Sequence, residues 1–347
     1  MPLPFEAARK GRVPVCTGSM RTLAFRMRMR LATFNIENFD RTTSKPDIFR
    51  ARVAALAPLL AQLEADVLCL QEVNAQKPDA GSPRSFAALD LLLADTIYST
   101  FHRVYSVRPE TGEPADVHNL AILSRWPVIA HRQVHHDFVP VEEWPALSSR
   151  GQRPPLRLLW DRPLLYAAVA PPQGAPLHIV NLHLRAPRAA FISGAKQGGR
   201  WRSSAEWAEG YYLAGRKRQG QALEARLFVE TLFDADPAAS IAVCGDLNAE
   251  AFETPTRILE ALPDDVESAE FSARRLEPLE RRVEPARRHT VIHDRRPVLL
   301  DHILASPALA GRCVEVDIAN AALVDEAHAP ADVAGSLHAP VVAVFER

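Results

Sequence analysis

The stretch Ile241-Ala-Val-Cys-Gly-Asp-Leu-Asn248 is an apolar run that ends in a glycine, a carboxylate and a carboxamide. The apolar part predicts a buried strand, and in an extended chain residues i and i+2 point to the same face. Asp246 and Asn248 are therefore expected to present their polar groups together. A carboxylate can accept a proton or hold a hard cation, and a carboxamide can donate to a developing oxyanion. The pair suits hydrolysis, although Gly-Asp is also ordinary turn chemistry.

Outward from this stretch, apolar runs alternate with helical periodicity. Apolar residues at spacings of three and four predict a helix from Phe49 to Leu63, and Pro58 predicts a kink or a restart within it. Further helices are predicted over 84–96, from about 204 to 233 and over 254–262. The other predicted strands cover 31–36, 66–72, 102–107, 119–124, 127–134, 164–170, 177–184, 298–304, 313–319 and 339–345. An Arg-rich, Pro-punctuated loop is expected over 274–297. This order predicts a mixed α/β sandwich.

Composition sets the broad class. The chain has 347 residues, 47% hydrophobic and 24% charged, which is ordinary for a globular protein with ample length for a core. No stretch approaches the roughly 20 apolar residues that span a bilayer, so membrane insertion is not expected. The four cysteines, at positions 16, 69, 244 and 313, are too scattered for a zinc or disulfide framework, which favours a reducing, cytoplasmic location.

Charge separates the N-terminus from the rest. Residues 1–30 hold seven Lys or Arg and one acid, a net charge of +6, whereas the remainder carries −7. We expect residues 1–29 to be a disordered basic extension and residues 30–347 to form a single domain. A nucleic-acid or membrane-surface arm and a transit peptide are the open alternatives for the extension. The body has no basic excess, so bulk attraction to DNA is not predicted.

Polar residues recur where apolar strands end. A cap or a satisfied turn explains any one of them, but the whole set predicts a shared polar cleft, because α/β folds build sites at strand ends. Oxygen and amide groups without thiolates suit Mg²⁺ or Mn²⁺, and histidine transfers protons near neutral pH. Metal-assisted phosphoester hydrolysis is therefore expected. The set comprises Asn35, Glu72, His183, Asp246, Asn248, Asp301 and His338.

Seven short motifs then give the chain a family resemblance. They are Phe34-Asn-Ile-Glu-Asn-Phe39, Leu70-Gln-Glu-Val73, Asn119-Leu-Ala-Ile-Leu-Ser-Arg125, Asn181-Leu-His-Leu184, Gly245-Asp-Leu-Asn-Ala249, Leu300-Asp-His-Ile-Leu304 and Ser336-Leu-His-Ala-Pro340. In this order they resemble the endonuclease/exonuclease/phosphatase superfamily, from about residue 30 to the C-terminus. The resemblance implies a DNase I-like fold: a four-layer α/β sandwich in which two packed mixed β-sheets are flanked by helices.

The resemblance also implies a role for each site residue. Glu72 would be the main ligand of a divalent metal, with Asn35 in support. Asp246 would orient or deprotonate the attacking water, and Asn248 would hold the phosphoryl oxygens. The remaining assignments are His338 against the scissile phosphate with Asp301 fixing its ring, His183 as a general acid or phosphate ligand, and Asn119 as a phosphate contact.

One departure stands out, since Leu337 replaces the aspartate that the family usually carries before the last histidine. Its loss removes a hard ligand and leaves open whether one metal or two are bound. Asp325 and Asp332 are the candidates to replace it in space. The outcome ranges from reduced metal affinity or rate to a catalytically impaired binding module.

Substrate choice is expected to lie in loops around the site. The segment 196–218 interleaves Lys and Arg with Trp and Tyr, a combination that grips nucleic-acid strands, although aromatics turned into a core beneath a solvated helix face fit equally. Arg185 and Arg200 are the basic candidates for substrate contact. A nuclease is the first hypothesis, and a phosphoinositide or sphingomyelin phosphoesterase is the alternative. No obligate protein partner is implied.

Overall fold

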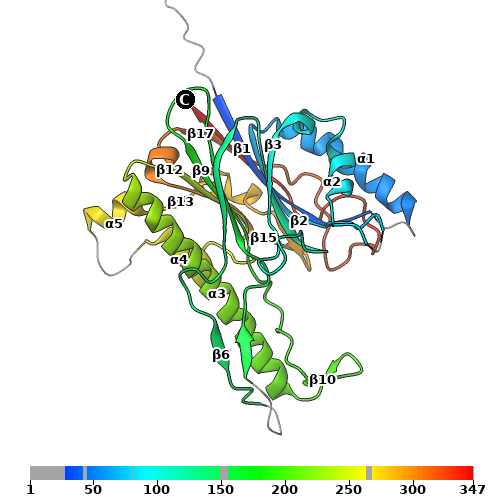
Figure 1. Cartoon of the computed structure of the whole chain (residues 1–347). Coiled ribbons are helices and arrows are strands. Elements are labelled where there is room, and N and C mark those ends of the chain that lie inside the picture. Colours follow the sequence, from blue (N-terminus) through cyan, green and yellow to red (C-terminus); the bar gives the residue numbers. More distant parts are fainter. Residues whose placement is uncertain (1–27, 42–44, 80, 149–154, 263–267, 347) are drawn as a thin grey trace, which may run out of the picture.

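Two β-sheets packed face to face form the centre of the molecule (Figure 1). The protein is described here from a computed structural model. The described residues are 28–41, 45–79, 81–148, 155–262 and 268–346.

The first sheet has six strands, and its edges come from the C-terminal part and the middle of the chain. Its strands β1 and β2 run parallel and the other neighbours run antiparallel, so the sheet is mixed. The order is β17 (Cys313–Ile318), β18 (Val341–Glu346), β1 (Arg28–Phe39), β2 (Val67–Val73), β4 (Asn119–Ser124) and β3 (His102–Tyr105).

The second sheet also has six strands and repeats this plan. Its central strands β9 and β12 run parallel, and the others pair antiparallel. The order is β13 (Glu277–Pro278), β16 (Asp301–Ala305), β12 (Ser240–Asp246), β9 (Leu177–His183), β8 (Leu164–Val169) and β5 (Val128–Val134).

Helices cover the outer face of each sheet. The helices α1 (Pro46–Leu63) and α2 (Ala87–Leu93), with the 3-10 turn η1 (Ile97–Thr100), pack on the first sheet, and α3 (Ser204–Ala235) and α4 (Thr254–Glu260) pack on the second. The central strands are apolar on both faces because one face meets the other sheet and the opposite face meets helices. The predicted four-layer α/β sandwich of two mixed sheets is confirmed.

The helix α1 departs from the prediction made at Pro58. It runs from Pro46 to Leu63 without a restart, with Pro58 inside it, so the expected restart is wrong. A buried face formed by Leu56, Leu60 and Leu63 holds the two halves against the sheet and outweighs the missing donor.

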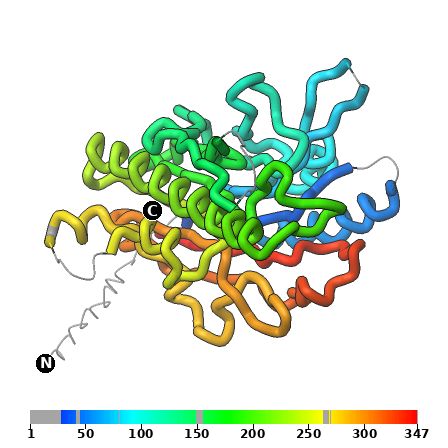
Figure 2. The backbone as a smooth tube through the Cα atoms, turned by 90° about the horizontal axis from the view of Figure 1, so that it is seen from below, coloured from blue at the N-terminus to red at the C-terminus, as the bar shows by residue number. Residues whose placement is uncertain are grey.

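The two halves of helix α3 (Ser204–Ala235) pack in different parts of the molecule. Its C-terminal half buries Phe228, Val229 and Phe233 against the second sheet, whereas its N-terminal half extends beyond the sandwich. There it joins the hairpins β6–β7 (Glu142–Trp144, Leu156–Leu158) and β10–β11 (Lys196–Gln197, Arg200–Trp201). We call this projection, residues 142–148, 155–160 and 186–218, the arm. Figure 2 shows α3 running across the underside of the molecule.

The region predicted as an Arg-rich loop, 274–297, contains short ordered elements. They are the end of α5 (Ala269–Arg274), β13, the 3-10 turns η2 (Leu279–Arg282) and η3 (Pro285–Arg287), and the hairpin β14–β15 (Val291–His293, Arg296–Val298). The short helix α6 (Pro307–Ala310) follows β16.

The N-terminal boundary differs slightly from the prediction. The strand β1 begins at Arg28, and the side chain of Met29 is buried opposite Phe345 of β18. The expected basic extension otherwise lies outside the described residues. Among the helices of the described ranges, none has the length and apolar character that crossing a lipid bilayer requires.

Candidate active site

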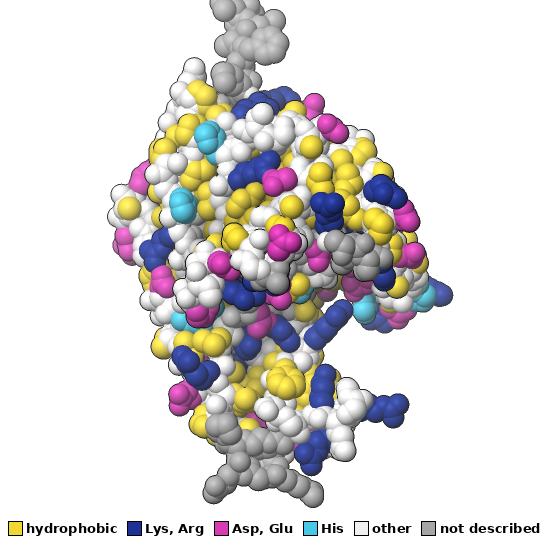
Figure 3. Space-filling view, turned by 45° about the vertical axis from the view of Figure 1, so that its right-hand side comes forward, with side chains coloured by type: hydrophobic (Ala, Val, Ile, Leu, Met, Phe, Trp, Pro, Cys, Tyr) yellow, Lys and Arg dark blue, Asp and Glu magenta, His cyan; other side chains and the backbone are white. Residues whose placement is uncertain are grey.

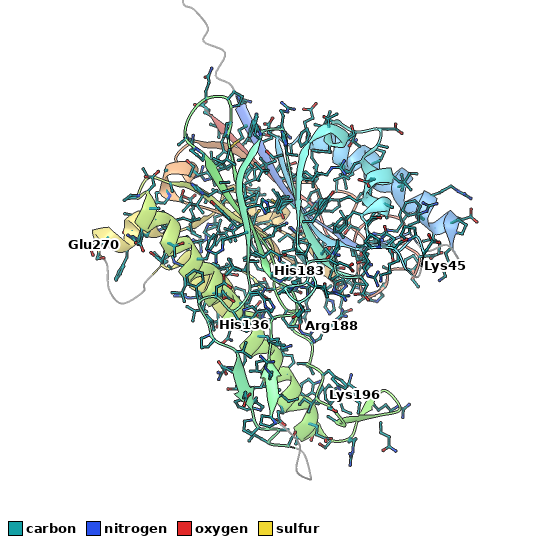
Figure 4. The ribbon with its side chains drawn as sticks, viewed as in Figure 1. Lys45, His136, His183, Arg188, Lys196 and Glu270 are labelled. Atoms are coloured by element: carbon teal, nitrogen blue, oxygen red, sulfur yellow. The ribbon has the colours of Figure 1, made fainter. Side chains whose placement is uncertain are left out.

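One cleft of about 820 Å³ opens where the central strands of both sheets end. Its wall includes Glu72 from β2, His183 from β9, Asp246 from β12, and His338 just before β18. Asp301 lies buried behind His338. In Figure 4, His183 lies at the lower margin of the sandwich, near Arg188 and above the arm. Residues that the sequence predicted to converge are therefore brought together.

Asn35 ties the two sheets at the floor of this cleft. Its buried amide nitrogen donates to Glu72 Oε1 at 3.2 Å and to Asp246 Oδ2 at 3.0 Å. Asn35 and Glu72 belong to the first sheet and Asp246 belongs to the second, so one side chain fixes the spacing of two carboxylates across the sandwich.

The backbone around the cleft adopts unusual conformations. Positive φ angles are uncommon for residues other than glycine and concentrate at functional sites. At Glu72, φ is 60° where the pairing of β2 with β4 shifts register, and the irregularity turns its side chain into the cleft. The cleft-lining residues that share a positive φ are Glu37, Asn38, Glu72, His118 and Asn248.

Gly245 allows the end of β12 to place Asp246 in the cleft. Its φ is 134°, and a Cβ built there would lie 1.9 Å from the carbonyl oxygen of Leu182 on β9. Only glycine allows this approach between the two parallel strands. The glycine that precedes the carboxylate in the sequence is therefore a structural requirement of the strand end.

Asp246 is held by three donors. Its Oδ1 accepts from the Asn248 backbone N–H at 2.8 Å, and its Oδ2 accepts from the side chains of Asn35 and Asn248. The second amide hydrogen of Asn248 bonds to the Leu184 carbonyl at 3.1 Å. Both hydrogens are thus engaged inside the protein, and donation to a phosphoryl oxygen requires the bond to Asp246 to break.

The surroundings of Asp246 change the pKa of its carboxyl group. Burial raises the pKa of its carboxyl group to about 7, and the charge of Asp301 adds to the rise. Repulsion between neighbouring carboxylates is the condition that a bound cation relieves.

His338 is paired with a buried carboxylate. Its Nδ1 lies 2.8 Å from Asp301 Oδ2, and the side chain of Asp301 is fully buried. Burial alone would lower the pKa of His338, but the charge and hydrogen bond of Asp301 outweigh it and raise that pKa to about 10. The ring is an imidazolium at neutral pH that donates to Asp301 and keeps Nε2–H for another partner.

His183 has the opposite electrostatic environment. Burial, followed by the positive charge of Arg162, lowers the pKa of His183 well below 6.5. Arg162 Nη1 lies 2.8 Å from His183 Nδ1 and can only donate, so the proton of the neutral ring sits on Nε2. That Nε2 lies 3.4 Å from Asp246 Oδ2.

Sequence reasoning missed Arg162, whose guanidinium lines the cleft. It belongs to the loop Asp161-Arg162-Pro163 before β8. Asp161 accepts from Arg185 at 2.7 Å and from Lys217 of α3 at 3.0 Å. A charged pair directly before a strand was the available signal, but such loops are common. Arg162 brings a fixed positive charge to the carboxylate cluster.

The structure places another carboxylate beside Leu337. The Leu337 backbone N–H donates to Glu37 Oε2 at 3.0 Å, and Glu37 lines the cleft. Asp325 instead accepts from the backbone N–H groups of Asp294 and Arg295 in the β14–β15 turn. Neither Asp325 nor Asp332 belongs to the described lining of the cleft.

Three predicted substrate contacts have different outcomes. Asn119 is 2% exposed, and its amide donates to the backbone carbonyls of Val73 and Ala115, so it braces β2 and β4. Both amide hydrogens of Asn119 are engaged in this way, and its assignment as a phosphate contact stays a prediction. Arg185 lines the cleft, and Arg200 is exposed on the arm outside the described cleft lining.

The donor set fits a hard metal ion. Carboxylate oxygens of Asp246 and Asp301 lie within 4.8 Å of each other and of a ring nitrogen of His338, and Glu72 faces Asp246 through Asn35. The carboxylates are the ligands in this group, because the protonated His338 ring offers no lone pair. The buried Oδ1 of Asp301 has no hydrogen-bond partner among the described residues. Oxygen-rich clusters of this kind suit divalent cations. The acidic group can therefore hold a metal ion.

The sequence profile of the Endonuclease/Exonuclease/phosphatase family matches residues 32–333. The chain belongs to this family. It is accordingly a hydrolase that acts on phosphoester bonds. A search of curated protein sequences gives no significant match.

Several solved structures share this fold at low sequence identity. Truncated TDP2 from Caenorhabditis elegans has a TM-score of 0.53 at 16% identity, over 92% of this chain and 98% of that one. The 3'-5' exonuclease NExo from Neisseria meningitidis has 0.51 at 17%, over 92% and 100%. A conserved protein of unknown function from Enterococcus faecalis V583 has 0.52 at 17%, over 92% and 100%.

Proposed function

We propose that the protein is a divalent-metal-dependent phosphodiesterase that hydrolyses nucleic acid. The observation that carries this proposal is the convergence of Glu72, Asp246 and the Asp301–His338 pair from both sheets in one cleft. Carboxylates on one side and a protonated imidazole on the other match the needs of phosphodiester hydrolysis, in which an activated water attacks and negative charge grows on the phosphoryl oxygens.

Each residue has a separate task. Glu72, with Asn35 setting its position, and Asp246 would hold Mg²⁺ or Mn²⁺, which supplies Lewis-acid stabilisation of the phosphoryl group when bound. Asp246 orients the attacking water and accepts its proton. The Nε2–H groups of His338 and His183 donate to phosphoryl oxygens, and Asp301 keeps the His338 ring oriented. The leaving oxygen takes its proton from solvent.

Two comparisons favour nucleic acid as the substrate class. One solved relative is described as a 3'-5' exonuclease, and a variant of NExo is described as a 3' phosphatase bound to a product DNA hairpin, with a TM-score of 0.50 at 18% identity. The cleft wall also carries Arg162, Arg185 and Arg188, which suit an anionic backbone.

A substrate panel tests the proposal. Single-stranded DNA, plasmid DNA, a structureless RNA and bis-(p-nitrophenyl) phosphate are offered with Mg²⁺ or Mn²⁺. Asp246→Asn and His338→Ala are each expected to lower turnover at least a hundredfold. Asp47→Asn and His131→Ala, at exposed positions, are the matched controls. Cleavage of the small diester alone would overturn the nuclease, and full activity of Asp246→Asn would overturn the mechanism.

Metal binding is tested without turnover. Isothermal titration with Mn²⁺ is expected to show binding that weakens at least tenfold in Glu72→Gln, because a carboxylate facing Asp246 is lost. Unchanged Mn²⁺ affinity would remove Glu72 from the metal site. Metal binding without turnover of any substrate would instead favour the impaired module that Leu337 raised.

A further inference from the structure

The charge of one segment of the arm, residues 186–203, is one-sided. The segment 186–203 contains four basic residues and no acid. All four side chains belong to exposed residues, and none forms an ion pair with a carboxylate among the described residues. They are Arg188, Lys196, Arg200 and Arg202.

The nearest acids on α3 do not neutralise this surface. Glu209 is buried, and its carboxylate accepts from the backbone N–H groups of Leu147 and Ser148 and from the indole of Trp144. Glu206 is also buried, in the first turn of the helix that Ser203 caps. These two glutamates are therefore turned into the arm, and the exposed Glu142 pairs with Arg216 of α3, away from the four basic residues.

Aromatic rings lie between these cations. Phe191 is 73% exposed. Trp201 on β11 is partly exposed, and Lys196 Nζ lies 4.6 Å from its ring centroid. Exposed rings beside cations are the elements with which proteins bind single strands, by base stacking and phosphate contact.

The basic surface is continuous with the catalytic cleft. The cleft wall runs from His183 through Arg185 to Arg188, and the chain then passes directly onto the arm. Figure 4 places Arg188 between His183 and Lys196. Figure 3 shows Lys and Arg side chains around the notch that separates the body from the arm. A polymer that leaves the cleft on this side meets cations along its path.

The arm is held firmly enough to present this surface. The Ala190 N–H donates to the Gly210 carbonyl of α3 at 2.8 Å, and a Cβ on Gly210 would lie 2.7 Å from the Ala190 oxygen. Ile192, Ala195 and Leu213 contribute to a small apolar core inside the arm. The segment therefore packs closely on a helix whose other end is anchored in the body.

We propose that the arm binds a single-stranded nucleic-acid segment that extends out of the catalytic cleft. Arg188, Lys196, Arg200 and Arg202 contact its phosphates, and Phe191 stacks on a base. This inference rests on the proposed nuclease function for its substrate class. A lipid surface is disfavoured, because the cations are interleaved with single rings and lead into the cleft, whereas membrane binding needs a broad apolar face.

Binding and turnover are measured separately. A fluorescein-labelled 20-nucleotide strand without base pairing is titrated by anisotropy over a salt series. The triple variant Lys196→Ala/Arg200→Ala/Arg202→Ala is expected to bind at least tenfold more weakly at 0.1 M salt. Its slope of log affinity against log salt is expected to fall by about 2, since each phosphate contact to a single strand contributes about 0.7. Phe191→Ala is expected to lose at least about fivefold.

A control triple variant removes the same charge from another part of the surface. The variant Lys45→Ala/Arg50→Ala/Lys77→Ala removes three exposed cations around α1 and is expected to bind like the parent protein. Hydrolysis of bis-(p-nitrophenyl) phosphate, which is too small to reach the arm, is expected to stay within twofold in the arm variants. Circular dichroism confirms that each variant is folded.

The outcomes separate the two proposals. Unchanged oligonucleotide affinity in the arm triple would overturn the inference, and so would an equal loss in the control triple or in small-diester turnover. Loss of binding to phosphatidylserine vesicles with oligonucleotide affinity retained would replace the strand by a membrane. Arm-dependent oligonucleotide binding in a protein that hydrolyses no diester would support the arm and overturn the nuclease.

Discussion

The body and the arm of this molecule differ in the size of the apolar cores that hold them. The body encloses three large apolar clusters, one between the sheets and one under each helical layer. The arm has one small cluster formed by Leu158, Ala190, Ile192, Ala195, Leu213 and Ala214. The side chains that line the cleft are held between extensive cores, whereas the proposed strand-binding surface rests on a modest one. Catalysis requires side chains in fixed positions, whereas a surface that binds strands of different sequence can adjust its conformation.

The largest expected effect belongs to the body alone. In Asp301→Asn the negative charge beside His338 disappears, and turnover of every substrate is expected to fall about 100- to 10,000-fold. The pKa of His338, raised to about 10 in the parent, is therefore expected to fall, with Asp246 and Glu72 left as the charges that still oppose the effect of burial. NMR titration of the His338 ring checks this.

The arm provides the control for this change. Oligonucleotide affinity of Asp301→Asn is expected to stay within about threefold of the parent, because the cations on the arm are untouched. A His338 ring that still titrates above pH 8 in Asp301→Asn would show that Asp301 is not the source of its charge.

The next effect compares the two halves of α3. Phe228→Ala removes a ring that packs edge-on against Tyr166 in the body and is expected to cost about 3–5 kcal/mol of global stability. Leu213→Ala deletes a buried side chain of the arm core. Its cost is expected to remain local, with little change in the main unfolding transition and faster proteolysis within 186–218. Equal shifts of the main transition would show that body and arm unfold as one unit.

A smaller effect is expected where the body meets the arm. Arg162→Met removes the charge that orients His183, and turnover is expected to fall about 10- to 100-fold. The pKa of His183 is expected to rise, because the positive charge of Arg162 helps to lower it. NMR of the His183 ring follows the shift, and Arg132→Met on β5 is the control. An unmoved His183 titration would mean that burial alone sets it.

The smallest expected effect is a change in how the stability of the body depends on pH. Tyr98 accepts from the Ala65 N–H and donates to the Leu60 carbonyl, and burial raises its pKa to about 12. The unfolded chain ionises this group near pH 10, so the associated stability is present below pH 10 and is lost as pH rises toward 12. Tyr98→Phe is expected to cost about 1 kcal/mol at pH 8 and to flatten this dependence in denaturant melts. An unchanged slope would exclude Tyr98 as its source.

Most of the body was predictable because its strands are continuous apolar runs. The strand over 119–124 has the predicted bounds, and Glu72, His183 and Asp246 lie at the predicted strand ends in one cleft. Burial forces such runs into the sheets, and the polar residues at their ends then lie together in the cleft at the edge of the core.

The remainder depends on geometry that local sequence does not encode. Glu37 reaches the Leu337 backbone through a positive φ, and Arg162 meets His183 through a loop. The sequence predicts Asn119 as a phosphate contact at a strand end, but in the structure its side-chain amide donates to the backbone carbonyls of Val73 and Ala115. The hairpins of the arm have strands of two or three residues, too short for periodicity to reveal, and tertiary contacts decide them.

The Asn35–Asp246 hydrogen bond spans 211 positions of the chain, and His338 arrives almost at its end. Neither the first nor the second half of the polypeptide alone contains a complete reaction centre. A chain that stops before His338 therefore lacks part of the cleft wall. A fragment from either half of the chain is expected to be inactive alone, and only reassembly of the two halves is expected to restore turnover.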